Sequence, residues 1–231
     1  MGKMYTDVKT WQPQVGCRFD CIYCKPSFRR MVHRVWACQG KKCTGCRDFS
    51  PHEHAERLRS FPSRQHGLIW PCAHGDISFG RPTFIRQVID EANRHQDRTF
   101  YWQSKNPQCF EQYLSDFSTP NSILLTTLET NRDDGYYQVS KAPLPSERFQ
   151  AFRDLKWDRK ILTIEPIMDF DEDVFYSWIV EVDPEAVWIG YNSHPTIRLP
   201  EPSLKKTRGF ISLLRKNKIQ VRKKFLREKV D

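Results

Sequence analysis

The sequence predicts an α/β fold in which short parallel strands form a partial (β/α)6 barrel. Six short apolar runs, several of them β-branched or aromatic, lie near turn residues as buried strands do. A helix candidate follows each run, and such alternation joins parallel strands by right-handed crossovers. At 231 residues the chain has room for one sizeable core, whereas six units are too few for the eight-fold barrel.

The strand candidates are residues 8–14, 67–72, 99–103, 122–128, 160–164 and 186–189. The helix candidates are residues 50–59, 81–95, 107–116, 146–155, 171–182 and 203–217. We expect residues 1–231 to form a single domain. Within it, residues 25–64 are expected to form a basic, cysteine-rich insertion after the first strand, and residues 203–231 a basic C-terminal helix and strand.

Local signals place the starts and faces of several helices. The run Ser50-Pro-His-Glu53 has the form of a capping box with proline at the first helical position, which predicts a helix start. Ser146 occupies the expected position of another helix cap. A third helix, residues 81–95, is predicted because its apolar residues recur at helical spacing. These residues are Phe84, Ile85, Val88, Ile89 and Ala92.

Three cysteines follow the first expected strand. Cys17, Cys21 and Cys24 have the spacing C-x3-C-x2-C, with an aromatic residue directly before the last thiol. Three thiolates on one loop can hold three corners of a 4Fe-4S cube and leave the fourth iron open. A structural cluster or a closed zinc site takes four ligands instead. The loop lies at the C-terminal edge of the sheet, where the chemistry of parallel barrels collects. The alternative interpretation is half of a zinc knuckle.

This loop, placed after the first strand of a six-unit barrel, resembles that of the radical S-adenosylmethionine (radical SAM) superfamily. Further segments resemble an uncharacterised branch of it that is often found in phages. They are Trp11-x-Pro13-x-x-Gly16-Cys17, Trp70-Pro-Cys-Ala-His-Gly-Asp76, Ser104-Lys105-Asn106-Pro107, Glu165-Pro166 and Ile189-Gly190. The order and approximate spacing hold across nearly the whole chain, while no settled reaction of that branch supplies a substrate.

The resemblance implies a 4Fe-4S cluster on the three thiolates and S-adenosylmethionine on the open iron. An external donor reduces the cluster, which cleaves the cofactor to a 5′-deoxyadenosyl radical that abstracts hydrogen from a substrate. Tyr23 would then pack near the adenine. Asp76, in the segment that stands where the family commonly has Gly-Gly-Glu, would accept from the cofactor's ammonium group. His74 could do so only when neutral.

The resemblance also implies, by position along the chain alone, that further residues reach the active face. They are Ser104, Lys105 and Asn106 after the third strand, Thr127 and Glu129 from the fourth, and Glu165 from the fifth. Each is equally a candidate for a structural hydrogen bond at a strand end.

A second cysteine set follows in the basic insertion. Cys38, Cys43 and Cys46 have the spacing C-x4-C-x2-C, and a reducing compartment favours metal ligation over disulfides. A fourth ligand would close a zinc site or, with a cysteine, a second iron–sulfur cluster. The candidates for it are Cys72, Cys109, His33, His52 and His54. The alternative is that these thiols are free and buried.

The net charge of +9 gathers at two basic poles. Residues 203–231 carry eleven Lys/Arg against two acids, and residues 1–64 carry thirteen against five, whereas residues 161–202 carry one against nine. Clustered bases contact phosphates, which suggests a nucleic-acid or nucleotide substrate. The candidate contacts near the three cysteines are Arg29, Arg30, Arg34, Lys41 and Lys42, with Phe28, Trp36 and Phe49 available to stack on bases. We expect the last helix and a terminal strand to bring the tail back near the first strand, so that the two poles form one groove over the acidic fifth and sixth strands. A solvated surface is the alternative.

The sequence has no apolar run long enough to span a bilayer and no apolar signal core at its start, so we expect a cytoplasmic protein without a membrane partner. Two functions are compatible with these observations. One is a radical SAM enzyme of unknown substrate. The other is a non-enzymatic, zinc-stabilised nucleic-acid-binding protein in which the cysteines between Cys17 and Cys46 hold zinc. The six strand–helix units argue against the second, because small zinc modules do not need them.

Overall fold

A seven-stranded parallel sheet forms the centre of the molecule. The computed structural model describes residues 8–24, 32, 43–63, 65–194, 196–224 and 226. The strand order is β1-β4-β5-β6-β7-β8-β9, and every neighbouring pair is parallel. Because β1 and β9 are edge strands, the sheet is a partial barrel and not a closed one.

Each predicted strand range contains one strand of this sheet. These strands are β1 (Val8–Trp11), β4 (Leu68–Pro71), β5 (Thr99–Gln103), β6 (Ser122–Thr127), β7 (Lys160–Ile164) and β8 (Ala186–Ile189). The seventh strand, β9 (Val221–Lys223), belongs to the basic tail and extends the sheet beyond β8.

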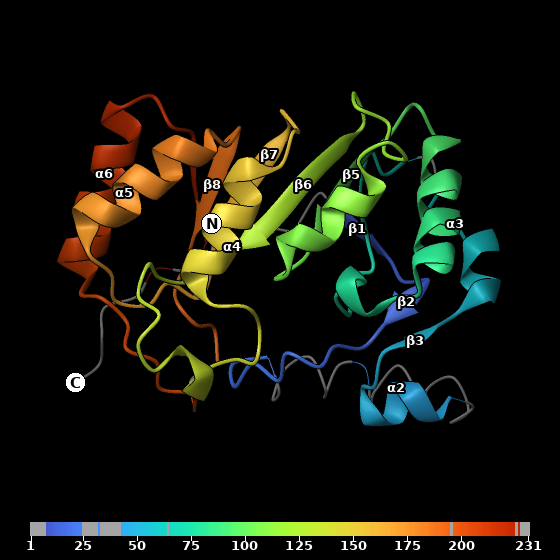
Figure 1. Cartoon of the computed structure of the whole chain (residues 1–231), viewed down its shortest axis with the longest axis horizontal. Helices are drawn as coiled ribbons and strands as arrows, with labels where there is room; N and C mark the ends of the chain where they lie inside the picture. The colour runs from blue at the N-terminus through green and yellow to red at the C-terminus, as the bar shows by residue number, and fades with distance from the viewer. Residues whose placement is uncertain are drawn as a thin grey trace.

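Helices line one face of the sheet. Figure 1 shows α3 (Pro82–Asn93), α4 (Pro145–Asp154), α5 (Glu172–Val182) and α6 (Leu204–Lys216) along it, and α2 (Thr44–Asp48) set apart below β3. The main core lies between these helices and the sheet. Its strand residues alternate with those of the other face, and Trp102, Leu124 and Leu162 are fully buried in it.

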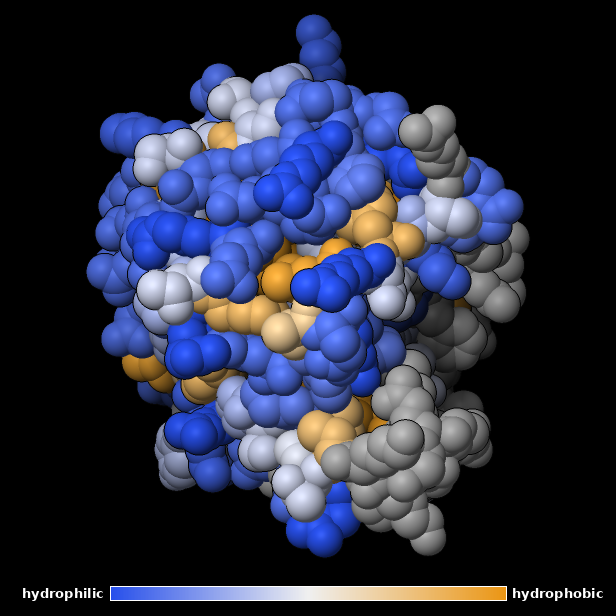
Figure 2. All heavy atoms as spheres, turned by 90° about the vertical axis from the view of Figure 1, so that its right-hand side faces the viewer, coloured by the Kyte–Doolittle hydropathy of each residue, from blue (hydrophilic) through white to orange (hydrophobic). Residues whose placement is uncertain are grey.

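The helix α3 shows why this layer forms. The five apolar residues expected on one face are all buried, and Pro82 stands in its first turn. Its opposite side is polar, and Figure 2 shows that this face of the molecule is mostly hydrophilic with only small apolar areas. An amphipathic helix therefore covers the sheet and presents charge to solvent.

The uncovered face of the sheet changes character along the strands. Nearer the N-terminal ends of the strands it is apolar, with Tyr101, Ile123 and Leu125 in a second buried cluster. Towards the C-terminal ends, Gln103 donates to Thr127 (3.0 Å), and the hydroxyls of Thr127 and Thr163 lie 2.8 Å apart. This end of the concave face is thus a polar surface with an apolar base.

The predicted helix at residues 50–59 is wrong. Residues His52–Glu53 form strand β3, which pairs antiparallel with β2 (Gln14–Val15), and only Ala55–Arg59 turn into a 3₁₀ helix, η1. The capping-box pattern does not produce a helix here, because the same residues pair as a strand with the segment that follows β1. The Ser50 carbonyl lies 2.7 Å from the His52 ring.

Two further helices differ from their predictions. Residues Pro107–Tyr113 form a 3₁₀ helix, η3, instead of an α-helix over 107–116. The N-cap of α4 is Leu144 and not Ser146. The Ser146 hydroxyl and amide both bond the Asp133 carboxylate, at 2.5 and 3.0 Å. Ser203, in contrast, caps α6 through a bond from the Lys206 amide.

The tail does not pair with the first strand. The strand β9 lies at the edge of the sheet opposite β1, but Lys224, just past its end, lines the same cavity as Thr10 of β1. The helix α6 delivers β9 to the free edge of β8. Over the residues described, the structure contains no helix both long and apolar enough to cross a membrane.

Candidate active site

A glycine-dependent turn carries the chain from β2 into the three-cysteine loop (residues 16–24). Gly16 has φ +94°, and a Cβ there would lie 2.2 Å from the Ser50 carbonyl oxygen. Its amide donates to the His74 carbonyl (3.0 Å), and Gly16 forms a parallel bridge with Gly75. Only glycine combines this backbone angle with such close approach. The loop is therefore held against the C-terminal end of β4.

The three thiols of this loop line one cavity of about 440 Å³. Cys21 is buried, whereas Cys17 and Cys24 are partly exposed. The Phe19 amide donates to Cys17 Sγ (3.4 Å), and the Ser140 hydroxyl lies 3.1 Å from Cys21 Sγ. Hydrogen bonds to sulfur of this kind tune iron–sulfur clusters.

The thiols differ in acidity. A hydrogen bond from the Cys24 thiol, together with Lys105 and Ser140, lowers the pKa of Cys21 to about 6. The same bond raises the pKa of Cys24. Burial, with the charge of Asp76, raises the pKa of Cys17. Cys21 is thus the most acidic thiol of the loop.

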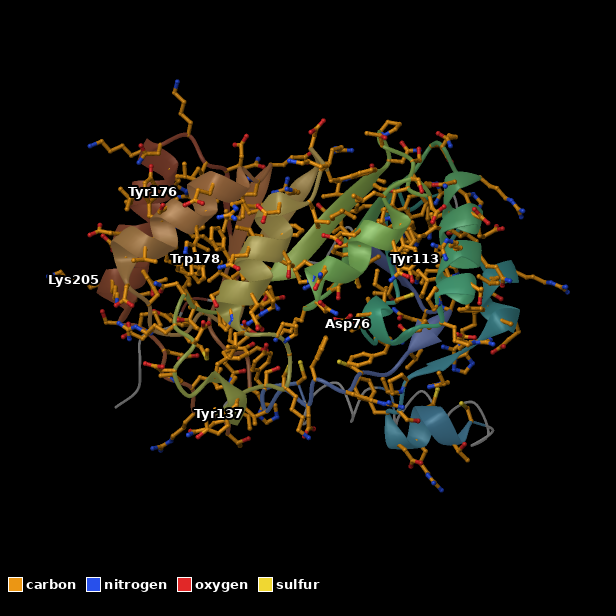
Figure 3. All side chains as sticks on the ribbon, in the orientation of Figure 1. Asp76, Tyr113, Tyr137, Tyr176, Trp178 and Lys205 are labelled. Atoms are coloured by element: carbon orange, nitrogen blue, oxygen red, sulfur yellow. The ribbon has the colours of Figure 1, made fainter. Side chains whose placement is uncertain are left out.

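Most of the residues predicted to bind the cluster or the cofactor lie at this cavity. Those that line it are Cys17, Cys21, Tyr23, Cys24, His74, Asp76, Lys105, Thr127 and Glu165. Figure 3 shows Asp76 beside the lower ends of the strands, close to the loop, and Lys205 far away at the outer side of α6. Ser104, Asn106 and Glu129 are absent from the lining.

Glu129 organises the wall behind the loop. It is fully buried and accepts from Lys105, from the hydroxyl of Tyr23, from the hydroxyl of Tyr136 at 3.0 Å and from the guanidinium of Arg148 at 2.9 Å. Although burial opposes ionisation, Arg148 and Lys105 lower the pKa of Glu129 to about 2. The carboxylate therefore acts as the shared partner of two buried cations.

Lys105 connects this network to the cysteines. Its Nζ lies 3.4 Å from Cys21 Sγ and 4.5 Å from the centre of the Tyr23 ring. Burial alone would favour the neutral amine, but the charges of Cys21 and Glu129 raise the pKa of Lys105 above its ordinary value. A permanent positive charge thus stands against the middle cysteine.

Asp76 holds the backbone around the cavity. Its Oδ1 accepts from the Ser78 and Ser104 hydroxyls, both at 2.7 Å, and from the Ser78 amide at 3.0 Å, while Oδ2 accepts from the Lys105 amide at 2.8 Å. Burial raises its pKa. These bonds fix the segment that carries Lys105, and Oδ2 accepts fewer hydrogen bonds than Oδ1.

His74, in the same segment as Asp76, is neutral near pH 7. Burial and the charge of Arg57 lower the pKa of His74 to about 4.

The opposite wall contains Lys224 of the basic tail together with residues that the sequence analysis did not single out. Lys224, just past β9, forms an ion pair with Glu165 and lines the cavity with Asn192 and Ser193. Burial raises the pKa of Glu165, and Lys224 opposes this rise. Gln103 also lines the cavity, and its buried Oε1 has no hydrogen-bond partner among the described residues. No motif marks them, because they meet only when β5, β7 and β9 share one sheet.

The second cysteine set gathers elsewhere. Cys43 and Cys46 lie together with His52 and His54, and their ligand atoms are within 4.8 Å of one another. Cys72 is buried at the end of β4 and lines the cavity, while Cys109 packs beside the main core. The predicted residues outside the described part of the chain are Cys38, Arg29, Arg30, Arg34, Lys41, Lys42, Phe28, Trp36 and His33.

The three-cysteine loop fits a 4Fe-4S cluster on its donor set. Three thiols from one short loop border a single cavity, and Lys105 adds a positive charge that balances thiolate charge. The loop supplies three protein ligands, whereas a closed zinc site or a fully ligated cluster takes four.

Several solved structures share this fold. A radical SAM methyltransferase from Sphaerobacter thermophilus matches with a TM-score of 0.58 at 17% identity, over 97% of this chain and 68% of that one. SuiB from Streptococcus suis bound to S-adenosylmethionine matches with a TM-score of 0.58 at 6% identity, over 95% of this chain and 50% of SuiB. SuiB bound to precursor peptide SuiA gives 0.58 at 8% identity, over 95% and 48%.

The likeness confirms the predicted fold, because the parallel sheet corresponds to the curled partial barrel of these structures. The chain spans about half the length of SuiB. No protein-family model matches the sequence, and no curated protein matches it. The resemblance to the phage-type branch therefore stays a prediction.

Proposed function

We propose that this protein is a radical SAM enzyme. The observation that carries the proposal is the convergence of Cys17, Cys21 and Cys24 on one cavity at the C-terminal ends of a parallel partial barrel. The likeness to a radical SAM methyltransferase and to SuiB bound to S-adenosylmethionine supports it.

In this proposal the three cysteines hold a 4Fe-4S cluster, and the cavity takes S-adenosylmethionine. Such a cluster, reduced by an external donor, would supply the electron for cleaving the cofactor's carbon–sulfur bond and so for hydrogen abstraction from the substrate. The chain's own part is to position the reactants and exclude water. Lys105 keeps a positive charge 3.4 Å from Cys21 Sγ, which favours the reduced, more negative state.

The cavity offers acceptors for the polar groups of S-adenosylmethionine. Gln103 has a buried Oε1 without a partner, and its Nε2 is fixed by Thr127. An unpaired buried acceptor costs free energy until a donor reaches it, so we assign Gln103 to a hydroxyl or ammonium group of the cofactor. Glu165 and Asp76 Oδ2 are the anionic acceptors of the same wall. Tyr23 keeps its hydroxyl on Glu129, which leaves its ring for the adenine.

Nucleic acid or nucleotide remains the substrate class that we propose, and the basic tail supports it. Exposed cations follow α6 and β9: Lys205, Arg208, Arg215, Lys216, Lys218, Arg222 and Lys223. Because phosphate contacts release counterions, binding to labelled oligonucleotides should weaken steeply as salt rises. Binding that does not change with salt concentration, or no binding at low salt, would exclude this substrate class. A peptide or small metabolite would then be the candidate substrate.

Anaerobic reconstitution tests the enzyme itself. The protein is loaded with iron and sulfide, reduced with dithionite and given S-adenosylmethionine, and 5′-deoxyadenosine is measured. We expect a brown protein that makes 5′-deoxyadenosine, and a variant with Cys17, Cys21 and Cys24 changed to Ala that makes none. Cleavage by this triple variant would contradict the assignment. A colourless wild-type protein that holds only zinc would support the non-enzymatic alternative instead.

A further inference from the structure

The segment beside the three-cysteine loop contains a second set of metal ligands. We propose that Cys43, Cys46, His52 and His54 (the Cys2His2 set) bind one structural zinc ion, which fixes the strand that leads into the loop. This proposal does not depend on the reaction of the enzyme, because its ligands, its metal and its test are separate.

The spacing of the ligand atoms suits a single ion. All four lie within 4.8 Å of one another, and Cys46 Sγ is 3.2 Å from Nε2 of both histidines. Around a tetrahedral zinc ion, with its usual bond lengths, ligand atoms are about 3.3–3.8 Å apart. A small contraction or expansion therefore brings this set to tetrahedral geometry, and two thiolates with two imidazoles are ligands that zinc prefers.

The hydrogen bonds of the two rings direct their free nitrogens to the same point. His52 Nδ1 lies 2.7 Å from the Ser50 carbonyl oxygen, and His54 Nδ1 lies 2.8 Å from Glu56 Oε1. Both partners only accept when Glu56 is ionised, so each Nδ1 carries the hydrogen and each neutral ring keeps its lone pair on Nε2. Carbonyl and carboxylate partners of this kind orient metal-binding histidines.

This assignment leaves two lone pairs facing each other, because the Nε2 atoms of His52 and His54 are 2.9 Å apart. Two acceptors at that distance repel unless a metal ion or a proton lies between them. A thiol 3.2 Å from both nitrogens has one hydrogen and cannot satisfy the two together. One metal ion removes the conflict for all the atoms at once.

The backbone is shaped for the same contact. Cys43 caps α2, and its Sγ accepts from the Cys46 amide at 3.5 Å. Between them stands Gly45, where a Cβ would lie 2.7 Å from the His52 ring. The missing side chain lets the ring reach the two cysteines.

The Cys2His2 set is joined directly to the three-cysteine loop. In the β2–β3 pair, His52 stands opposite Val15, and the His54 amide donates to the Pro13 carbonyl (2.6 Å). The Cys17 amide in turn donates to the Phe49 carbonyl (3.4 Å). Among the described residues, the buried apolar cluster here consists of Val15, Val32 and Cys46, with Cys43 and Phe49 packed against it. A metal bound in such a segment contributes directly to its folding.

The first experiment measures metal in a protein that lacks the other site. The variant with Cys17, Cys21 and Cys24 changed to Ala is purified from zinc-containing medium, and its zinc and iron are quantified. We expect one equivalent of zinc and no iron. Adding Cys46→Ser or His54→Gln should lower zinc at least tenfold, whereas adding Cys109→Ser, the matched thiol control, should not. A parent without zinc, or unchanged zinc after Cys46→Ser, would overturn the proposal.

Cobalt replaces zinc in a second measurement that needs no ligand variant. Added to the demetallated parent, Co²⁺ should give the ligand-field absorption of a tetrahedral cobalt–thiolate site. An octahedral spectrum, or none, would contradict the ligand set.

Amide hydrogen exchange tests the link between the zinc site and the three-cysteine loop. Removing zinc should speed exchange at residues 14–17 at least tenfold and leave the exchange of α6 unchanged. Equal protection at residues 14–17 would show that the metal does not fix the strand.

Discussion

The three-cysteine loop and the Cys2His2 set are neighbours in sequence, but their side chains face different surroundings. The thiols of the first set border a cavity of about 440 Å³. The ligand atoms of the second face one another within 4.8 Å. The first set offers three thiols beside open space, whereas the second offers four donor groups that face one another.

Such a difference would let one cysteine-rich region support two kinds of chemistry. An open coordination position lets a substrate or cofactor reach the metal, while a closed shell leaves the metal only a structural role. The surroundings agree with this division. A buried cation stands beside Cys21, whereas the rings of the second set are held by a carbonyl and a carboxylate.

The largest expected effect is a double dissociation between the two sets. Cys24→Ser should abolish 5′-deoxyadenosine formation and lower bound iron while zinc stays at its wild-type level. Cys46→Ser should remove zinc and retain the ability to take up iron, because the three-cysteine loop keeps its ligands. Metal analysis of both variants after reconstitution checks this. Loss of both metals in both variants would mean that the two sets form one site.

The next effect tests the buried carboxylate behind the loop. Glu129→Gln leaves Arg148 and Lys105 without their anion, and breaking a buried pair in this way costs roughly 3–5 kcal/mol. Urea unfolding at pH 7 measures it. The surface variant Glu172→Gln is the matched control and should change the free energy of unfolding little.

The same carboxylate predicts a dependence on pH. Because the folded pKa of Glu129 is lowered from 4.5 to about 2, its stabilising effect is present above pH 4.5 and is lost as the pH falls towards 2. The wild-type free energy of unfolding should thus decline more steeply with acid in this window than that of Glu129→Gln. Parallel curves for the two proteins would assign the acid sensitivity to other groups.

A pair of glycine substitutions should separate the two sites sterically. At Gly75 a Cβ would lie 2.6 Å from the Gly16 carbonyl oxygen, and at Gly45 it would lie 2.7 Å from the His52 ring. Overpacking of this kind costs about 1–3 kcal/mol. We expect Gly75→Ala to lower iron loading and Gly45→Ala to lower zinc. Gly67→Ala, which meets nothing within 4 Å, is the control, and an equal loss in all three would contradict the steric argument.

The smallest effect concerns the cofactor alone. Gln103→Leu removes the buried acceptor in the cavity wall, and one lost hydrogen bond of about 1 kcal/mol weakens S-adenosylmethionine binding by roughly five- to tenfold. Isothermal titration of the reconstituted protein measures it, with zinc content as the internal control. Unchanged affinity would place the cofactor away from β5.

Much of the fold was predictable because it follows from local patterns. Buried parallel strands are short apolar runs, so all six expected strands were found, and the spacing of apolar residues predicted the buried face of α3. The capping box at Ser50 failed since the same residues also pair as β3 with β2. Helix propensity is a weak signal, and tertiary contacts override it.

The parallel α/β architecture and the position of the three cysteines after the first strand could be predicted from the sequence, because both depend on short-range spacing. Tertiary structure decided which distant groups meet there. It brought Glu129 and Arg148 behind Lys105, and it brought Lys224 from the tail to Glu165. The tertiary structure also brings His52 and His54 to Cys43 and Cys46. Spacing along the chain cannot encode these contacts, since they depend on which strands become neighbours in the sheet and on how closely a glycine lets two backbones approach.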